Sequence, residues 1–187
     1  MKLQTVSCLI LAGGESKRMN HSDKGLVQFK DRPLVEHVIS ALEDQVDDFV
    51  ISANRNFDTY RQFSSTVIAD VGGKNGPLSG IAAALPTCQH ELVLVVPCDM
   101  PNLPSNLVEI LLAHLDETDL SIIEVHKRTQ LVFLMRKSLL TSVQHLLLSS
   151  QYKLMHWVKS CSPAIIDCSD SAEAFRNINS LHDIGQT

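Results

Sequence analysis

The stretch from Val6 to Gly14 constrains the fold of this chain more than any other part of the sequence. A mostly apolar run of strand length ends at two consecutive glycines, and the cations Lys17, Arg18 and Lys24 follow shortly after. Paired glycines at the end of a strand let a ligand approach the backbone, and backbone N–H groups bind anions. Because guanidinium and ammonium groups bind phosphate well, we predict a loop that holds a triphosphate.

Apolar runs of strand length recur along the chain. They lie at residues 6–11, 49–51, 67–68, 92–96, 120–123, 131–135 and 164–166, and helix-period segments lie at 33–42, 78–85, 105–114 and 138–148. Alternating strands and helices predict an α/β fold with a doubly wound, mainly parallel sheet and helices on both faces. Ligands of such sheets bind at the carboxyl ends of the strands, where the glycine loop falls.

Length and composition are those of a single soluble domain over residues 1–187. The hydrophobic fraction is 44% and the net charge is −5, which argues against binding to nucleic acid or an anionic membrane. No apolar run reaches the length of a membrane span and no signal peptide is evident, so the cytoplasm is expected. The 5 cysteines lack a Cys-x-x-Cys pair and are expected to be reduced, and the 8 histidines lack zinc-ligand spacing.

The run at 92–96 is aliphatic throughout, which indicates a central strand buried on both faces. It leads into Pro97-Cys98-Asp99-Met100-Pro101, so Asp99 lies just beyond the end of that strand. Magnesium prefers carboxylate oxygen and takes few protein ligands when phosphates complete its shell. Asp99 is therefore the predicted metal ligand; the alternative is an N-cap for the helix that begins near Pro104.

A second glycine-rich loop follows Asp70, at the end of the expected third strand. Gly76-Pro77 marks the start of a helix, and the small residues Ser79 and Gly80 would let a base or sugar lie against the backbone. The alternative is that Gly80 serves only tight packing of that helix on the sheet.

The C-terminal third offers Lys153 beside the only tryptophan, and the pair Asn177 and Asn179. In an extended segment the two asparagines point to the same side and can reach one ligand or one metal-bound phosphate. An Asx turn is the competing interpretation.

The glycine loop has neither the P-loop spacing nor that of the dinucleotide folds. It resembles the Leu-Ala-Gly-Gly-x-Ser-x-Arg-Met…Asp-Lys motif of nucleotidyltransferases, and among them the molybdenum cofactor guanylyltransferases of the MobA type. The resemblance extends over nearly the whole chain. It includes Asp70, Gly76-Pro77-Leu78-x-Gly80, Pro97-Cys98-Asp99-x-Pro101, Lys153-Leu154…Trp157 and Asn177-x-Asn179.

This resemblance implies a magnesium-dependent enzyme that transfers GMP from GTP to the terminal phosphate of molybdenum-bound molybdopterin and releases pyrophosphate. Carried onto this sequence, the nucleotide-binding residues would be Leu11, Ala12, Gly13, Lys24, Ser52, Asn54, Asp70 and Asp99. The catalytic residues would be Arg18, Lys24 and Asp99, with Asp99 holding Mg²⁺. We assign Lys153, Asn177 and Asn179 to the acceptor. Cofactor-biosynthesis proteins and recipient molybdoenzymes would be transient partners of a monomer.

Three positions depart from the family pattern. Asn20 stands where glycine often follows Arg-Met, and asparagine tolerates positive φ. Ser52 aligns with a family asparagine after the second strand, whereas Asn54 matches another. Ser180-Leu181 replaces Thr-Pro after the final asparagine pair.

Two alternatives remain at this level. One is the same chemistry with CTP or another acceptor phosphate, although such relatives commonly read Leu-Ala-Ala-Gly where this chain has Leu11-Ala12-Gly13-Gly14. The other is a non-catalytic nucleotide-binding module. Such a module would not need Arg18, Lys24 and Asp99 together.

Overall fold

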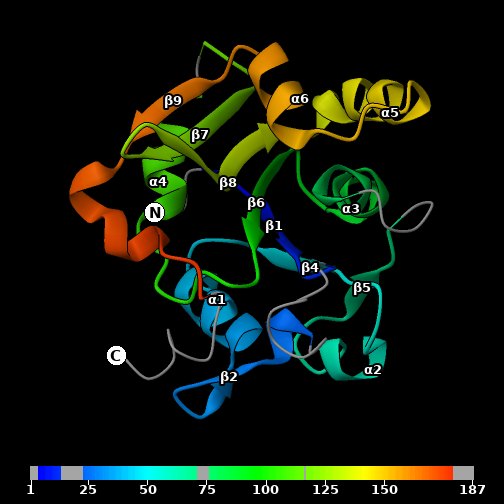
Figure 1. Ribbon diagram of the computed structural model, residues 1–187, viewed down its shortest axis with the longest axis vertical. Coiled ribbons are helices and arrows are strands. Elements are labelled where there is room, and N and C mark those ends of the chain that lie inside the picture. Colours follow the sequence, from blue (N-terminus) through cyan, green and yellow to red (C-terminus); the bar gives the residue numbers. More distant parts are fainter. Residues whose placement is uncertain (1–3, 14–22, 71–75, 116, 179–187) are drawn as a thin grey trace.

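The computed structural model describes residues 4–13, 23–70, 76–115 and 117–178 (Figure 1). Its strands are β1 (Val6–Leu11), β2 (Gln28–Phe29), β3 (Arg32–Pro33), β4 (Asp48–Ser52), β5 (Thr66–Ile68), β6 (Leu92–Pro97), β7 (Leu120–Val125), β8 (Arg128–Arg136) and β9 (Ala164–Asp167). Its α-helices are α1 (Leu34–Leu42), α2 (Phe57–Tyr60), α3 (Pro77–Ala84), α4 (Leu107–Leu112), α5 (Leu140–Leu148) and α6 (Leu154–Ser160). Short 3₁₀ segments are η1 (Lys24–Leu26), η2 (Leu85–Thr87), η3 (Lys137–Leu139) and η4 (Ser169–Phe175).

The main sheet has the strand order β5-β4-β1-β6-β8-β7-β9. The strands β5, β4, β1 and β6 are parallel, and β9 is parallel to β7. Only β8 in this sheet runs against its neighbours, with antiparallel pairing to both β6 and β7. The predicted fold class, a mainly parallel α/β sheet, is confirmed.

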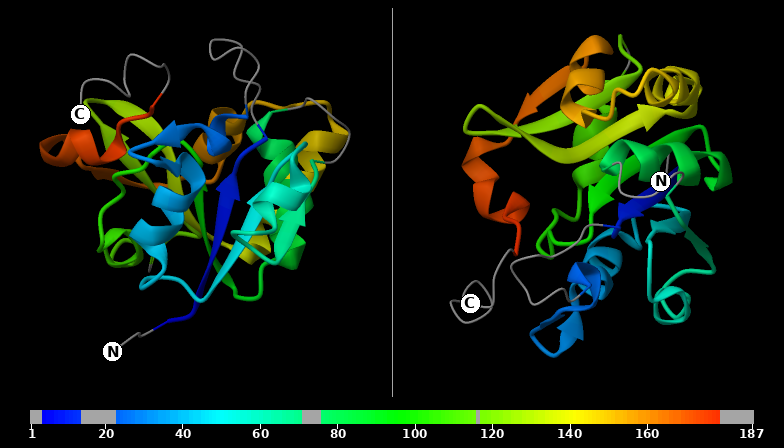
Figure 2. Two further views of the ribbon diagram at one scale, coloured as in Figure 1. Left: turned by 90° about the horizontal axis from the view of Figure 1, so that it is seen from below. Right: turned by 45° about the vertical axis from the view of Figure 1, so that its right-hand side comes forward.

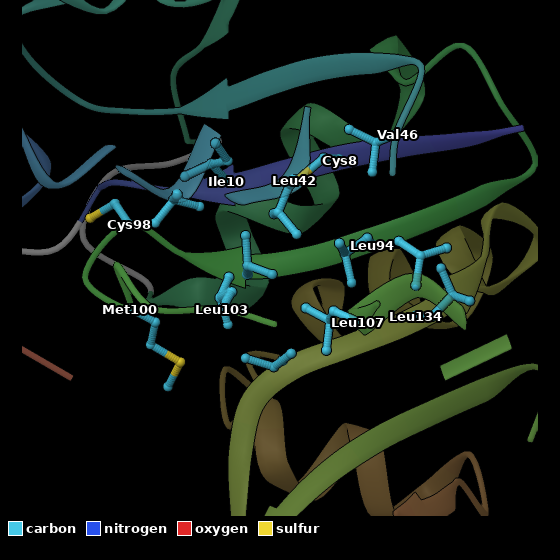
Figure 3. Close-up of a cluster of buried hydrophobic side chains, with 14 of the residues drawn as sticks. Cys8, Ile10, Leu42, Val46, Leu94, Cys98, Met100, Leu103, Leu107 and Leu134 are labelled. Atoms are coloured by element: carbon cyan, nitrogen blue, oxygen red, sulfur yellow. The ribbon is translucent and has the colours of Figure 1, made fainter. Parts of the chain in front are cut away.

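Two apolar layers cover the faces of the sheet. The side chains of Cys8 and Ile10 on β1 pack with residues of α1 and α4, and Figure 3 shows part of this layer. Leu9, between them in sequence, packs on the other face with residues of α3 and α6. This alternation follows from the two-residue period of a strand and explains why the central strands are mostly apolar.

The carboxyl ends of the four parallel strands are aligned. Leu11 is paired with both Ser52 and Pro97, and Ser52 is paired in turn with Ile68. Figure 2 (left) shows β1 pointing to the edge at which the red C-terminal part of the described chain ends. The loops predicted to bind the nucleotide therefore leave the sheet at one level.

Helix boundaries differ slightly from expectation. The helix expected at 105–114 is shorter, Leu107–Leu112, and its N-cap position is Asn106. Asp99 therefore does not cap α4, which removes the structural alternative for this residue.

Candidate active site

Lys24 and Asp99 form an ion pair at the end of the central strands. Asp99 lies two residues beyond β6 and is only 6% exposed. Its Oδ2 forms the ion pair with the ammonium group of Lys24, which lies on η1. Its Oδ1 is buried and has no hydrogen-bond partner among the described residues. A buried carboxylate oxygen without a donor is unfavourable, so this atom is suited to a ligand.

The segment that carries Asn177 lies directly beside Asp99. Ile178 donates its backbone N–H to the carbonyl oxygen of Asp99 at 2.9 Å. The amide oxygen of Asn177 is also buried and has no partner within the described ranges, so this oxygen forms no Asx turn there. Two unpartnered oxygens thus lie on adjoining segments.

Both of these oxygens are of the kind that a hard cation accepts. Carboxylate and amide oxygens are ligands that Mg²⁺ accepts, and the ion commonly keeps water and substrate phosphates in its remaining positions. In the described part of the chain, no group of three or more His, Cys, Asp or Glu side chains could hold a metal ion. Asp99 offers one free carboxylate oxygen in that part of the chain, which is the number of protein ligands that a magnesium ion shared with phosphates can use.

A second cluster joins Ser52, Asn54 and Asp70. The hydroxyl of Ser52 donates to Asp70 Oδ1 at 2.7 Å, and the amide of Asn54 donates to Oδ2 at 2.9 Å. The backbone N–H of Asp70 donates to Asn54 Oδ1 at 3.0 Å. Three residues predicted to bind the nucleotide thus lie together at the ends of β4 and β5.

Two glycines approach this cluster closely. A Cβ atom on Gly13 would lie 3.0 Å from Asn54 Nδ2 and 3.2 Å from Asp70 Oδ2. A Cβ atom on Gly80 would lie 2.6 Å from Ser52 Oγ and 3.0 Å from Asp70 Oδ1. Gly80 does serve tight packing, as the alternative interpretation held, but the packing is against the predicted nucleotide site.

The other predicted residues have different positions. Leu11 and Ala12 lead from β1 to Gly13, and the N–H of Ala12 donates to the carbonyl of Ser52 at 2.8 Å. Lys153 is exposed before α6 and belongs to neither cluster in the described structure. Arg18, Asn179 and the remaining loop residues Gly14, Lys17 and Asn20 lie outside the described residues.

Sequence reasoning missed a buried carboxylate next to Lys24. Asp23 Oδ1 accepts a hydrogen bond of 2.5 Å from the hydroxyl of Tyr60. Asp23 Oδ2 accepts one of 3.0 Å from the side-chain amide of Asn56. The Nε of Arg55 lies 3.6 Å from the same Oδ2. The one available signal was the position of Asp23 beside Lys24, because nothing in the sequence pairs it with Tyr60.

The thiol of Cys98, next to Asp99, is buried. Burial, followed by the nearby carboxylates of Asp99 and Asp23, raises the pKa of Cys98 well above its ordinary value. Cys98 therefore stays a protonated thiol near neutral pH.

The protein is therefore an α/β protein with two polar clusters at the carboxyl ends of its parallel strands. The chain resembles a crystal structure named molybdopterin-guanine dinucleotide biosynthesis protein A from Archaeoglobus fulgidus, with a TM-score of 0.76. The likeness covers 96% of this chain and 95% of the other at 18% identity, so it concerns the fold.

Sequence comparison gives the family. Residues 8–165 match the family described as MobA-like NTP transferase domain. A protein named molybdenum cofactor guanylyltransferase from Aliivibrio salmonicida is 37% identical over 180 residues, which is 95% of this chain and 93% of the relative. A protein of the same name from Shewanella sediminis is 39% identical, with 96% and 93% of the two chains covered. The chain belongs to the MobA-like NTP transferase domain family.

The helices were compared with the length and apolarity that a membrane span requires. None of those within the described residues is both long and apolar enough to span a bilayer.

Proposed function

We propose that this protein transfers GMP from GTP to the terminal phosphate of molybdenum-bound molybdopterin and releases pyrophosphate. The observation that carries the proposal is the Lys24–Asp99 pair, with its unpartnered Asp99 oxygen, at the aligned ends of β1 and β6. The two relatives named molybdenum cofactor guanylyltransferase, which align over more than nine-tenths of this chain, support the choice of substrates.

Asp99 and Asn177 would hold the magnesium ion. When bound, the ion would neutralise phosphate charge and orient the triphosphate for displacement. The chain itself contributes a buried carboxylate oxygen and a buried amide oxygen, which are kept without other donors in the described structure. Metal binding would therefore relieve an unfavourable desolvation.

Lys24 and Arg18 would bind the phosphates of GTP. An oxygen of the acceptor phosphate attacks the α-phosphorus, a new P–O bond forms, and the bond to the bridging oxygen of the β-phosphate breaks. The leaving pyrophosphate takes that bonding pair, and fixed cations stabilise the charge that develops on it. The attacking phosphate is already an anion at neutral pH, so no general base is needed.

Ser52, Asn54 and Asp70 would hold the nucleoside, with Leu11, Ala12 and Gly13 contributing backbone groups. A carboxylate has about four acceptor positions, so Asp70 retains acceptor capacity beyond its bonds to Ser52 and Asn54. The Watson–Crick edge of guanine carries two adjacent N–H donor groups, which a carboxylate accepts well. This chemistry supports GTP over CTP.

The acceptor would lie towards Lys153, Asn177 and Asn179. Lys153 would supply a cation for the acceptor phosphate. Asn177 would lie between the acceptor and the magnesium ion. In this proposal the protein acts in the cytoplasm as a monomer, with transient contacts to proteins that deliver or receive the cofactor.

The test is pyrophosphate release by the purified protein with molybdenum-bound molybdopterin, in parallel assays with GTP and CTP. Release with GTP that stops on chelation of magnesium is expected. A preference for CTP would overturn the choice of base. Nucleotide binding without pyrophosphate release, in the presence of loaded acceptor, would instead indicate a binding module.

A further inference from the structure

The carboxylate of Asp23 lies directly before Lys24 and is almost completely buried, with 4% of its side chain exposed. Burial of a carboxylate is costly unless donors compensate it. Its described donors are the hydroxyl of Tyr60 and the amide of Asn56, with the guanidinium of Arg55 nearby. All of these follow β4, so Asp23 ties the turn that carries Lys24 to the segment leading through α2.

The hydroxyl of Tyr60 also contacts the residue on the other side of Lys24. A Cβ atom on Gly25 would lie 2.5 Å from Tyr60 Oη and 3.3 Å from the Cβ of Cys98. Cys98 is the neighbour of Asp99 in sequence. Tyr60 therefore contacts both residues that flank Lys24, and Gly25 packs against the segment that carries the carboxylate partner of Lys24.

The turn itself has little stability of its own. It is a three-residue 3₁₀ segment with hydrogen bonds from Leu26 N to Asp23 O at 3.0 Å and from Val27 N to Lys24 O at 3.3 Å. Isolated 3₁₀ turns of this length are weak, since their hydrogen-bond geometry is poor. The position of Lys24 must therefore depend on contacts with the rest of the fold.

We propose that Asp23 and Tyr60 are positioning residues for nucleotidyl transfer. Their hydroxyl–carboxylate hydrogen bond fixes the turn so that the Lys24 ammonium meets the phosphates of the nucleotide beside Asp99. Neither side chain touches the reacting atoms. This inference rests on the role proposed for Lys24 above.

A double-mutant cycle tests the coupling, with turnover of GTP and acceptor measured for Tyr60→Phe, Lys24→Gln and the double variant. Tyr60→Phe alone should lower kcat about tenfold, whereas in the Lys24→Gln background it should lower kcat less than about twofold. A merely structural role would leave kcat unchanged well below the unfolding temperature. Equal effects of Tyr60→Phe in both backgrounds, or no effect on kcat, would overturn the inference.

Two further variants keep the test decisive. Asn56→Gly removes another hydrogen-bond donor to Asp23, and glycine fits the φ of 53° at this position. Even if Tyr60→Phe folds poorly, Asn56→Gly should lower kcat when Lys24 is present and lower it less in the Lys24→Gln background. Ser7→Ala removes a hydroxyl–carboxylate bond at the amino ends of β1 and β4, from Ser7 to Asp48 at 2.5 Å, and the bond that Ser7 Oγ accepts from His90 N–H at 3.0 Å. This variant should leave kcat unchanged. If Lys24→Gln alone keeps full turnover, the proposed role of Lys24 fails, and the positioning role fails with it.

Discussion

Ile178 donates its backbone N–H to the carbonyl oxygen of Asp99 at 2.9 Å, while its side chain is anchored in another part of the fold. Its side chain is 4% exposed and packs with Phe29, from the hairpin β2–β3, and Leu34, at the start of α1. An apolar contact on one side of the site thus holds Asn177 against the loop after β6.

Ile178→Ala should therefore lower both stability and the use of magnesium. The lost burial should reduce the free energy of unfolding by about 2–4 kcal/mol, measured in urea. The magnesium concentration that gives half-maximal turnover should rise because Asn177 is less well held. The matched control is Ile165→Ala, since Ile165 is 59% exposed and its loss should cost less than about 0.5 kcal/mol. Unchanged magnesium dependence would argue against Asn177 at the metal.

Asp99→Asn should abolish most of the magnesium-dependent turnover. The amide keeps the shape of the side chain but removes the charge that attracts both the ion and Lys24. Loss of such electrostatic stabilisation should reduce kcat by about 100-fold or more. Asp119→Asn, which removes only an exposed partner of Arg136, serves as the control and should keep normal turnover. Near-normal turnover by Asp99→Asn would show that this carboxylate does not hold the metal.

Gly80→Ala should impair nucleotide binding, although alanine normally stabilises a helix by about 1 kcal/mol relative to glycine. Here its Cβ would lie 2.6 Å from Ser52 Oγ, so the pair of Ser52 and Asp70 must move. We expect a higher KM for GTP and a lower unfolding temperature, measured by steady-state kinetics and calorimetry. Adding Ser52→Ala should restore part of the stability, because it removes the nearer of the two clashing atoms. Increased stability of Gly80→Ala alone would contradict the described packing.

The turn between β7 and β8 offers a gain in stability remote from the site. His126 and Lys127 have φ values of 48° and 60°, the left-handed conformation of a two-residue hairpin turn that asparagine and glycine favour. His126→Asn with Lys127→Gly should raise the free energy of unfolding by about 0.5–1 kcal/mol. Replacement of both residues by alanine should give no such gain. Turnover should stay unchanged in both variants.

The buried thiol of Cys88 should make stability fall in alkali. Burial, followed by the carboxylate of Asp48, raises the pKa of Cys88 to about 12. A group whose pKa is raised in the folded state binds its proton more tightly there, so its stabilisation is present below the unfolded pKa of about 8.5 and is lost as the pH rises. Between about pH 9 and 11 the wild type should lose up to about 1.4 kcal/mol per pH unit more than Cys88→Ala, measured by urea unfolding with reductant. Parallel curves for the two proteins would contradict the shift.

The main sheet could be predicted because burial on both faces leaves a direct mark on the sequence. The run that forms β6 is aliphatic over residues 92–96, and the run that forms β1 is mostly apolar and matches its predicted range. The hairpin β2–β3 leaves no such mark. Its turn residues Lys30 and Asp31 adopt positive φ without glycine, so the usual hairpin signal is missing.

The site was only partly predictable for a similar reason. Asp70 and Asp99 follow strands, and strand ends converge at one edge, so their grouping follows from topology. The contact of Asp23 with Tyr60 joins a turn to the four-residue helix α2, which is too short to give a periodic pattern. The proximity of Asn177 to Asp99 depends on Ile178 packing against the hairpin, which the sequence did not reveal.

The reversed strand β8 divides the predicted site residues into two groups along the chain. Lys24, Ser52, Asn54, Asp70 and Asp99 all precede it, on the parallel half of the sheet, whereas Lys153 and Asn177 come after it. The two groups are not independent, because Ile178, next to Asn177, donates its N–H to the carbonyl of Asp99. A chimaera whose C-terminal part starts at β8 would therefore exchange the residues around Asp99 together with Lys153.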